Sequence, residues 1–252
     1  MSHDLPPVRA LLLDFDGTML ETESASYGSW RALLAEHGYE LTPSTWAAAV
    51  GTVGGLDPVA LLEEHLGTPV DRDALEERAR RRHHELLAEE ALRPGVQRLV
   101  DDAQDRGLQT AIVTSASLDW VRGHLRRLGL DAAWKHVVSA NRDPARAKPA
   151  PVLYLEAAER LGVRPAEAIV VEDSPNGVLA AKRAGMQVVA FPNPITEAMD
   201  LGAADALVTD LAGLGLDGVL AALGGRTTAV TPGAPRVRTA PDDGRPARRF
   251  AR

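Results

Sequence analysis

Apolar residues gather in short, nearly continuous runs along this chain, and the runs predict buried β-strands. The first run, VRALLLDF, spans residues 8–15 and carries an acidic residue near its end. Runs of this kind are typical of strands covered on both faces, as in parallel sheets. Four more predicted strands follow, at 108–114, 136–139, 168–172 and 187–191.

Helical periodicity separates these runs. Apolar residues recur at helical spacing in four segments, 96–106, 118–128, 151–161 and 175–184. Strand and helix therefore alternate from about residue 94 to residue 191. This alternation predicts βαβ units, in which helices cover both faces of a parallel sheet, and so an α/β fold.

The stretch from residue 20 to residue 92 breaks the alternation. It predicts helices without intervening strands, at about 22–37, 43–50, 58–66 and 71–90. A helical block directly after the first strand predicts a cap over the carboxyl edge of the sheet, where open α/β sheets bind ligands. We therefore expect a core at 1–20 and 92–223 and a cap at 21–91.

The last segment, 224–252, is rich in Gly, Pro, Thr and Arg and has no apolar periodicity. This composition predicts a disordered, mildly basic tail. The sequence holds no internal repeat that would suggest a solenoid or propeller.

Composition narrows the possible functions. Hydrophobic residues form 45% of the 252-residue chain and the formal charge is −7, which argues against broad nucleic-acid binding. Because the chain has no cysteine, disulfides, thiolate metal sites and cysteine nucleophiles are excluded. The N-terminus lacks a secretion-signal pattern, and no apolar run approaches the roughly 18 residues of a membrane span. We expect a cytoplasmic protein that does not engage membranes; its oligomeric state is not readable.

The first candidate chemistry follows the first predicted strand, at Asp14, Asp16 and Gly17. Two carboxylates at positions i and i+2 leave a strand on the same side, so they can share one site. Gly17 permits a sharp turn that brings backbone N–H groups close to an anion. One carboxylate could attack phosphorus while the other transfers protons. An acidic turn that merely ends a strand fits these residues equally well when they are taken alone.

Three further clusters follow other predicted strands. Thr114 and Ser115 could grip a phosphoryl oxygen, although Ser and Thr also cap helices routinely. Lys148 could neutralise a phosphoryl group; an ordinary loop lysine is the alternative, but the chain has only three lysines. Glu172 and Asp173 suit Mg²⁺, which prefers oxygen ligands, although an acid here could also cap the next helix.

The four clusters together predict much more than any one of them. Each falls at the carboxyl end of a predicted parallel strand, and therefore on the same edge of one sheet. They supply a nucleophile, an acid/base, hydroxyl groups that bind phosphate, a cation and a metal site. Phosphoryl transfer needs these parts, because it depends on positioning and on neutralising charge.

In this order, DFDGTMLETE, VTSAS, KPAP and VEDSPNG resemble the signature motifs of the haloacid dehalogenase-like hydrolase superfamily. The resemblance covers about residues 8–210. It implies a Rossmann-like core with a helical cap, as in the branch of β-phosphoglucomutase and phosphoglycolate phosphatase. It also implies a Mg²⁺-dependent phosphatase that acts on a small phosphorylated metabolite through an aspartyl-phosphate.

The same resemblance implies roles for single residues. Asp14 would be the nucleophile, Asp16 the acid/base, and Thr114 and Lys148 would hold the phosphoryl group. Mg²⁺ would rest on Asp14, on the backbone carbonyl of Asp16 and on Asp173, with Glu172 contributing or supporting. Contacts to the substrate are expected from Gly17, Thr18 and Ser115. Glu21, where the family usually has Asp, is expected to affect only the hinge of the cap.

Several activities of the superfamily fit less well. Asp16 argues against a dehalogenase, which needs no second acid, and the absence of lysine from 20–92 argues against a phosphonate hydrolase. A β-phosphoglucomutase-type mutase remains the alternative. It is disfavoured because Ser26 stands where that enzyme has His and because 51–58 holds no basic residue.

Two questions stay open at this level. A catalytically inactive binding or regulatory protein with this fold is disfavoured, because no charged motif residue is lost. Four residues of the predicted cap could face the substrate or pack in a core: Tyr27, Trp30, Arg31 and Trp46. No single residue selects between a sugar phosphate and phosphoglycolate.

Overall fold

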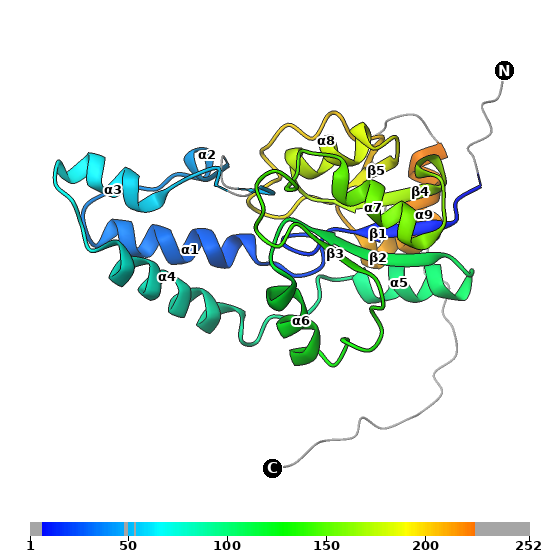
Figure 1. The fold of residues 1–252 in the computed structure, drawn as a ribbon, viewed down its shortest axis with the longest axis horizontal. Helices are drawn as coiled ribbons and strands as arrows, with labels where there is room; N and C mark the ends of the chain where they lie inside the picture. Colours follow the sequence, from blue (N-terminus) through cyan, green and yellow to red (C-terminus); the bar gives the residue numbers. More distant parts are fainter. Residues whose placement is uncertain (1–6, 48–49, 53, 225–252) are drawn as a thin grey trace, which may run out of the picture.

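The computed structural model describes residues 7–47, 50–52 and 54–224, and its centre is a sheet of six parallel strands (Figure 1). Their order across the sheet is β3-β2-β1-β4-β5-β6. The bounds are β1 Ala10–Leu13, β2 Gln109–Thr114, β3 Val137–Ser139, β4 Ala168–Glu172, β5 Gln187–Ala190 and β6 Ala206–Leu207. This architecture confirms the predicted α/β, Rossmann-like fold class. Apart from Gly224, the predicted tail lies outside the described residues.

The register of the three central strands aligns their carboxyl ends. Leu13, the last residue of β1, pairs with Ile112 of β2 and with Val171 of β4. The chain positions that follow these residues therefore meet at one edge of the sheet. This register explains why the polar clusters that follow these strands lie close together.

Helices cover both faces of the sheet, and the strand residues alternate between them. Leu11 and Leu13 of β1 pack in one hydrophobic cluster, together with α5 (Val96–Asp105), α6 (Leu118–Arg127) and α9 (Leu211–Gly224). Ala10 and Leu12 pack in the opposite cluster. That cluster includes α7 (Val152–Leu161) and α8 (Pro175–Arg183). Because β1 is buried on both sides, all four of its residues are apolar.

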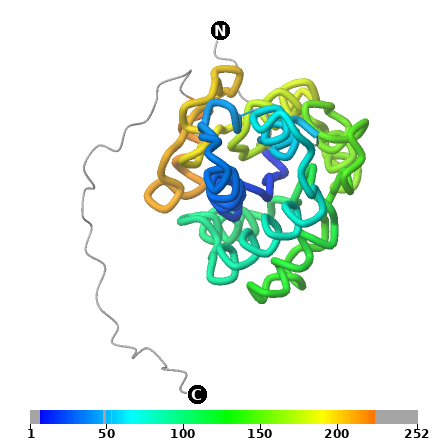
Figure 2. The backbone as a smooth tube through the Cα atoms, turned by 90° about the vertical axis from the view of Figure 1, so that its left-hand side faces the viewer, coloured from blue at the N-terminus to red at the C-terminus, as the bar shows by residue number. Residues whose placement is uncertain are grey.

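Four further helices form a separate lobe beyond the carboxyl edge of the sheet, which Figure 2 views from their side. They are α1 Glu23–Ala35, α2 Pro43–Trp46, α3 Pro58–Leu66 and α4 Arg72–Leu87. We call them the cap helices. They enclose their own hydrophobic cluster, in which Tyr27 and Trp46 are buried and Trp30 is partly buried. These aromatics therefore pack in a core, the alternative that the sequence left open.

The two connections between core and cap helices lie side by side. Leu20 forms a β-bridge with Leu92, and the backbone N–H of Arg93 donates to the Met19 carbonyl at 2.8 Å. The Arg93 guanidinium donates to the carbonyls of Gly17, Phe191 and Pro192. The boundaries 1–20, 21–91 and 92–223 remain our proposal, and this junction supports them.

One strand and one α-helix were absent from the predicted pattern. The strand β6 has only two residues, too few for a periodicity. The helix α9 contains several glycines and a non-helical residue, Gly215, with φ of 57°. Glycine disfavours helix, so the glycine content of this segment argued against predicting α9. The apolar face of α9 packs against α5. Among the described residues, no helix combines the length and apolarity needed to cross a membrane.

Candidate active site

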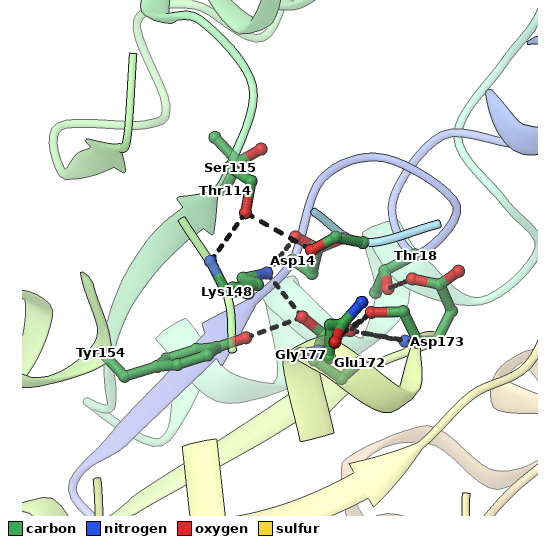
Figure 3. A network of polar contacts seen from close by, with 12 residues as sticks. Asp14, Thr18, Thr114, Ser115, Lys148, Tyr154, Glu172, Asp173 and Gly177 are labelled. Carbon is green, nitrogen blue, oxygen red and sulfur yellow. Dashed lines mark hydrogen bonds and ion pairs between the residues drawn. The ribbon is translucent and has the colours of Figure 1, made fainter. Parts of the chain in front are cut away.

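Asp14, the predicted nucleophile, directly follows β1 and is buried (Figure 3). The ammonium of Lys148 pairs with the Asp14 carboxylate and, at 2.5 Å, with Oε1 of Glu172. Lys148 is only 1% exposed, so both ion pairs are shielded from water. A buried charge needs such partners, because it has lost the stabilisation of solvent.

The protonation of this lysine follows from its neighbours. Burial alone would lower the pKa of Lys148, but the attraction of Asp14 and Glu172 outweighs burial and raises that pKa above its usual range. Lys148 is therefore an ammonium throughout the physiological range. It offers a fixed positive charge beside the carboxylate of Asp14.

Glu172 uses both of its oxygens to hold the surrounding chain. Oε1 accepts from Lys148 and from the Tyr154 hydroxyl at 3.0 Å. Oε2 accepts from the backbone N–H groups of Asp173 and Ser174 at 3.0 and 3.1 Å. Both oxygens of Glu172 therefore accept hydrogen bonds from the protein. Tyr154, in the first turn of α7, was not among the predicted site residues.

Asp173 is oriented by two side-chain donors. The hydroxyl of Thr18 donates to Oδ1 at 2.9 Å, and Nδ2 of Asn193 donates to Oδ2 at 2.7 Å. Gly17 has φ of 80°, and a Cβ there would lie 2.3 Å from Oδ2 of Asp173. Glycine is therefore required at position 17 for the approach of this acid. Substrate contacts of Gly17 and Thr18 stay predictions, and Asn193 was not foreseen.

Asp14, Glu172 and Asp173 form a buried acidic triad, and each offers an oxygen within 4.8 Å of the others. Burial raises the pKa of Asp14 and of Asp173, and the neighbouring carboxylates raise them further. A divalent cation would offset this repulsion and prefers such oxygen ligands. The donor set therefore fits a divalent metal ion.

A cavity of about 160 Å³ opens beside Asp14. Asp14, Asp16, Thr114 and Ser115 all line it, so the structure brings four of the predicted catalytic and substrate-binding residues together. Oγ of Ser115 accepts from the backbone N–H of Lys148 at 3.2 Å. The hydroxyl groups and the charged groups thus converge on one small space.

The loop after α2 reaches this edge of the sheet. The Thr52 hydroxyl donates to the carbonyl of Lys148 at 2.8 Å, and Nδ2 of Asn176 donates to the carbonyl of Val50 at 3.0 Å. The cavity is therefore bounded by both lobes. This geometry limits the size of any molecule that reaches Asp14.

Asp16 accepts a hydrogen bond at Oδ1 from Nε1 of Trp120, a residue of α6, at 2.8 Å. The Trp120 ring stacks on His83 of α4, with ring centroids 5.4 Å apart. It also packs edge-to-face with His124, with ring centroids 4.3 Å apart. Burial raises the pKa of Asp16, and the indole N–H opposes this rise. Trp120 is a positioning residue that sequence reasoning missed.

Replacing Trp120 with Phe keeps most of the ring packing and removes the donor. We expect kcat to fall about ten- to a hundredfold, the usual cost of a lost hydrogen bond to a charged group. Because the indole stabilises the carboxylate, the limb of the pH–rate profile that reports Asp16 should move to higher pH. Trp30→Phe, within the cap cluster, is the control. Slower turnover with an unshifted pH profile would show that Trp120 contributes packing alone.

Glu23, the first residue of α1, is a second residue without a predicted role. It lines the cavity beside Asp14. Burial, reinforced by the nearby charge of Asp16, raises the pKa of Glu23 to about 8. Its carboxyl group is therefore largely protonated at neutral pH and offers a hydrogen-bond donor to a ligand. The motif that carries Asp14 also contains Glu23, so proximity along the chain was an available signal.

Comparison with known proteins now adds an independent observation. The family model of haloacid dehalogenase-like hydrolases matches residues 8–185. The chain belongs to this family. The match spans more than half of the sequence and includes every cluster described above. It confirms the resemblance that the motifs predicted.

Individual relatives of this haloacid dehalogenase-like hydrolase are similar over most of their length. "Putative phosphatase YhcW" of Bacillus subtilis is 40% identical over 189 residues, which cover 75% of this chain and 86% of that protein. Hexitol phosphatase A of Escherichia coli is 32% identical, over 74% of this chain and 84% of that protein. These relatives confirm the predicted enzyme class, a phosphatase.

A solved structure is similar to the whole two-lobed arrangement. A mutant of CbbY from Rhodobacter sphaeroides, in complex with xylulose-(1,5)bisphosphate, aligns with a TM-score of 0.68 and 29% identity. The alignment covers 84% of this chain and 98% of that one. The fold is therefore shared from end to end of that protein.

Proposed function

We propose that this enzyme is a Mg²⁺-dependent phosphatase that hydrolyses a small phosphorylated metabolite, a sugar phosphate or phosphoglycolate, through an aspartyl-phosphate. The observation that carries the proposal is the convergence of Asp14, Asp16 and Thr114 on one small cavity, with Lys148 paired to Asp14. Relatives named as a hexitol phosphatase and in complex with a sugar bisphosphate support the substrate class. We expect the enzyme to work in the cytoplasm.

In the first half-reaction, a carboxylate oxygen of Asp14 forms a bond to phosphorus as the ester P–O bond breaks. Asp16, whose raised pKa favours the protonated form, gives its proton to the leaving oxygen. Lys148 balances the negative charge of Asp14 and of the phosphoryl group, and Thr114 and Ser115 orient the phosphoryl oxygens.

In the second half-reaction, Asp16 is a carboxylate and takes a proton from water as the water oxygen attacks phosphorus. The bond between Asp14 and phosphorus breaks, so Asp14 and free phosphate are released and Asp16 is again protonated. Mg²⁺ would be held by Asp14, Asp173 and the carbonyl of Asp16, with Glu172 in support. When bound, it would supply positive charge to the phosphoryl oxygens.

The test is phosphate release from a panel of sugar phosphates, phosphoglycolate and nucleotides. We expect release with Mg²⁺, loss of release with EDTA, and recovery when Mg²⁺ is restored, because the acidic triad then regains its cation. Turnover that persists after chelation would contradict the metal role. For the mutase alternative, glucose 6-phosphate formed from β-glucose 1-phosphate without net phosphate release would overturn the hydrolase proposal.

A further inference from the structure

A second cavity, of about 320 Å³, adjoins the one that holds Asp14. The two share Asp16, Glu23 and Arg142 as lining residues. A phosphoryl group placed at Asp14 would have its leaving oxygen at Asp16, the proton donor. The rest of the substrate therefore extends into the second cavity, whose volume suits a small ligand.

Arg142 stands at the junction of the two cavities. Its backbone is left-handed, with φ of 64°, and so is that of Asn141, with φ of 52°. The loop is fixed in this shape because Oγ of Ser139 accepts from the Asn141 N–H at 2.8 Å and donates to the Ala116 carbonyl at 2.5 Å. A left-handed arginine costs about 1–2 kcal/mol, and such residues cluster at ligand sites.

Within 7–47, 50–52 and 54–224, no carboxylate lies within the 4.0 Å of an ion pair with the guanidinium of Arg142, whereas many other arginines of the chain are paired. Arg142 nevertheless lines both cavities. A guanidinium offers a planar fork suited to a carboxylate or a phosphate.

Three residues of α4 also line the second cavity. Arg80, His83 and His84 occupy one side of α4, at positions i, i+3 and i+4, and all three line the cavity. Arg80 is paired with Glu77 at the exposed rim. Burial lowers the pKa of His83, and two acids, Asp16 and Glu23, line the same cavity. Of the two arginines that line it, Arg142 is the one without an ion pair among the described residues.

From this arrangement we propose that the leaving group of the substrate carries a second anionic group, a phosphate or a carboxylate, that Arg142 and Arg80 bind in the second cavity. The inference rests on the proposed function and narrows its substrate class to doubly anionic metabolites. A neutral polyol would leave the guanidinium of Arg142 without a counter-charge. A second anion would pair with it and would be held at the far end from the ester that is cleaved.

The experiment compares matched pairs that differ in one anionic group. Fructose 1,6-bisphosphate against fructose 6-phosphate tests a second phosphate, and 3-phosphoglycerate against glycerol 3-phosphate tests a carboxylate. For each pair, kcat/KM is measured on the wild type, and calorimetric binding is measured on Asp14→Asn with Mg²⁺. We expect a preference of about tenfold or more for the doubly anionic member of at least one pair.

The same measurements on Arg142→Ala and Arg80→Ala locate the preference. Each variant should lower the ratio between the two members of the pair, by about tenfold for Arg142→Ala. Arg78→Ala is the matched control, because Arg78 lies on the same helix and pairs with Glu36 instead of lining the cavity. It should leave the ratio unchanged.

The outcomes separate the two proposals. Equal affinity within both pairs, or no binding of any member, would overturn the inference, and so would an Arg142→Ala variant that weakens both members by the same factor. That last result would make Arg142 a ligand of the transferred phosphoryl group. A binding preference on Asp14→Asn without phosphate release by the wild type would support the inference and contradict the phosphatase proposal.

Discussion

The Asp14→Asn variant is expected to lose phosphate release by more than about a thousandfold while it keeps its fold. The amide occupies nearly the same volume as the carboxylate but is not a nucleophile. Lys148 retains Glu172 as a buried partner, so the surrounding network stays satisfied. The measurement is single-turnover phosphate release, with circular dichroism and thermal unfolding to report the fold.

A matched substitution separates this effect from a change in overall charge. Asp105→Asn alters an exposed acid at the end of α5, before the amino end of β2 and so away from the carboxyl edge that carries the site, and should leave turnover at the wild-type level. Appreciable activity in Asp14→Asn would remove Asp14 from the role of nucleophile. The aspartyl-phosphate mechanism would then fail with it.

The second large effect is expected at Lys148. In Lys148→Met, the Asp14 and Glu172 carboxylates stay buried without their cation. Removing one member of a buried ion pair typically costs about 3–5 kcal/mol, so the free energy of unfolding should fall by that order. Activity should fall at least about a hundredfold, because the phosphoryl group loses its fixed positive charge. Urea unfolding and kcat provide the two readouts.

A double variant tests the cause of the instability. Adding Glu172→Gln to Lys148→Met removes one of the orphaned carboxylates, so part of the lost free energy of unfolding should return while activity stays low. Additive losses in the double variant would mean that Lys148 and Glu172 stabilise the fold independently. Lys182, which pairs with Asp205 outside the site, offers a control as Lys182→Met, which should leave kcat unchanged.

The sequence was informative wherever local pattern and function coincide. Strand ends could be predicted because a strand buried on both faces is apolar along its length, so the acids Asp14 and Glu172 mark the ends of the apolar runs of β1 and β4. The shared edge then followed from the parallel register. Family motifs supplied the candidate roles, and the structure placed those side chains around one site.

The contacts that orient the site were not predictable in the same way. Trp120 lies 104 positions from Asp16, and Asn193 lies 20 positions from Asp173. No periodicity or motif joins such residues, because only the packing of whole helices and loops brings them together. Arg142 gave no signal either, since a left-handed backbone at a residue other than glycine is set by its surroundings.

The bridge between Leu20 and Leu92 has a consequence for how this enzyme can diversify. The chain departs from the sheet and comes back to it at adjacent points, so the intervening segment behaves as an insert whose two ends meet. The interior of that insert can vary in length and composition without disturbing the register of β1, β2 and β4. Evolution can therefore recruit the same catalytic edge for new esters by exchanging the insert alone.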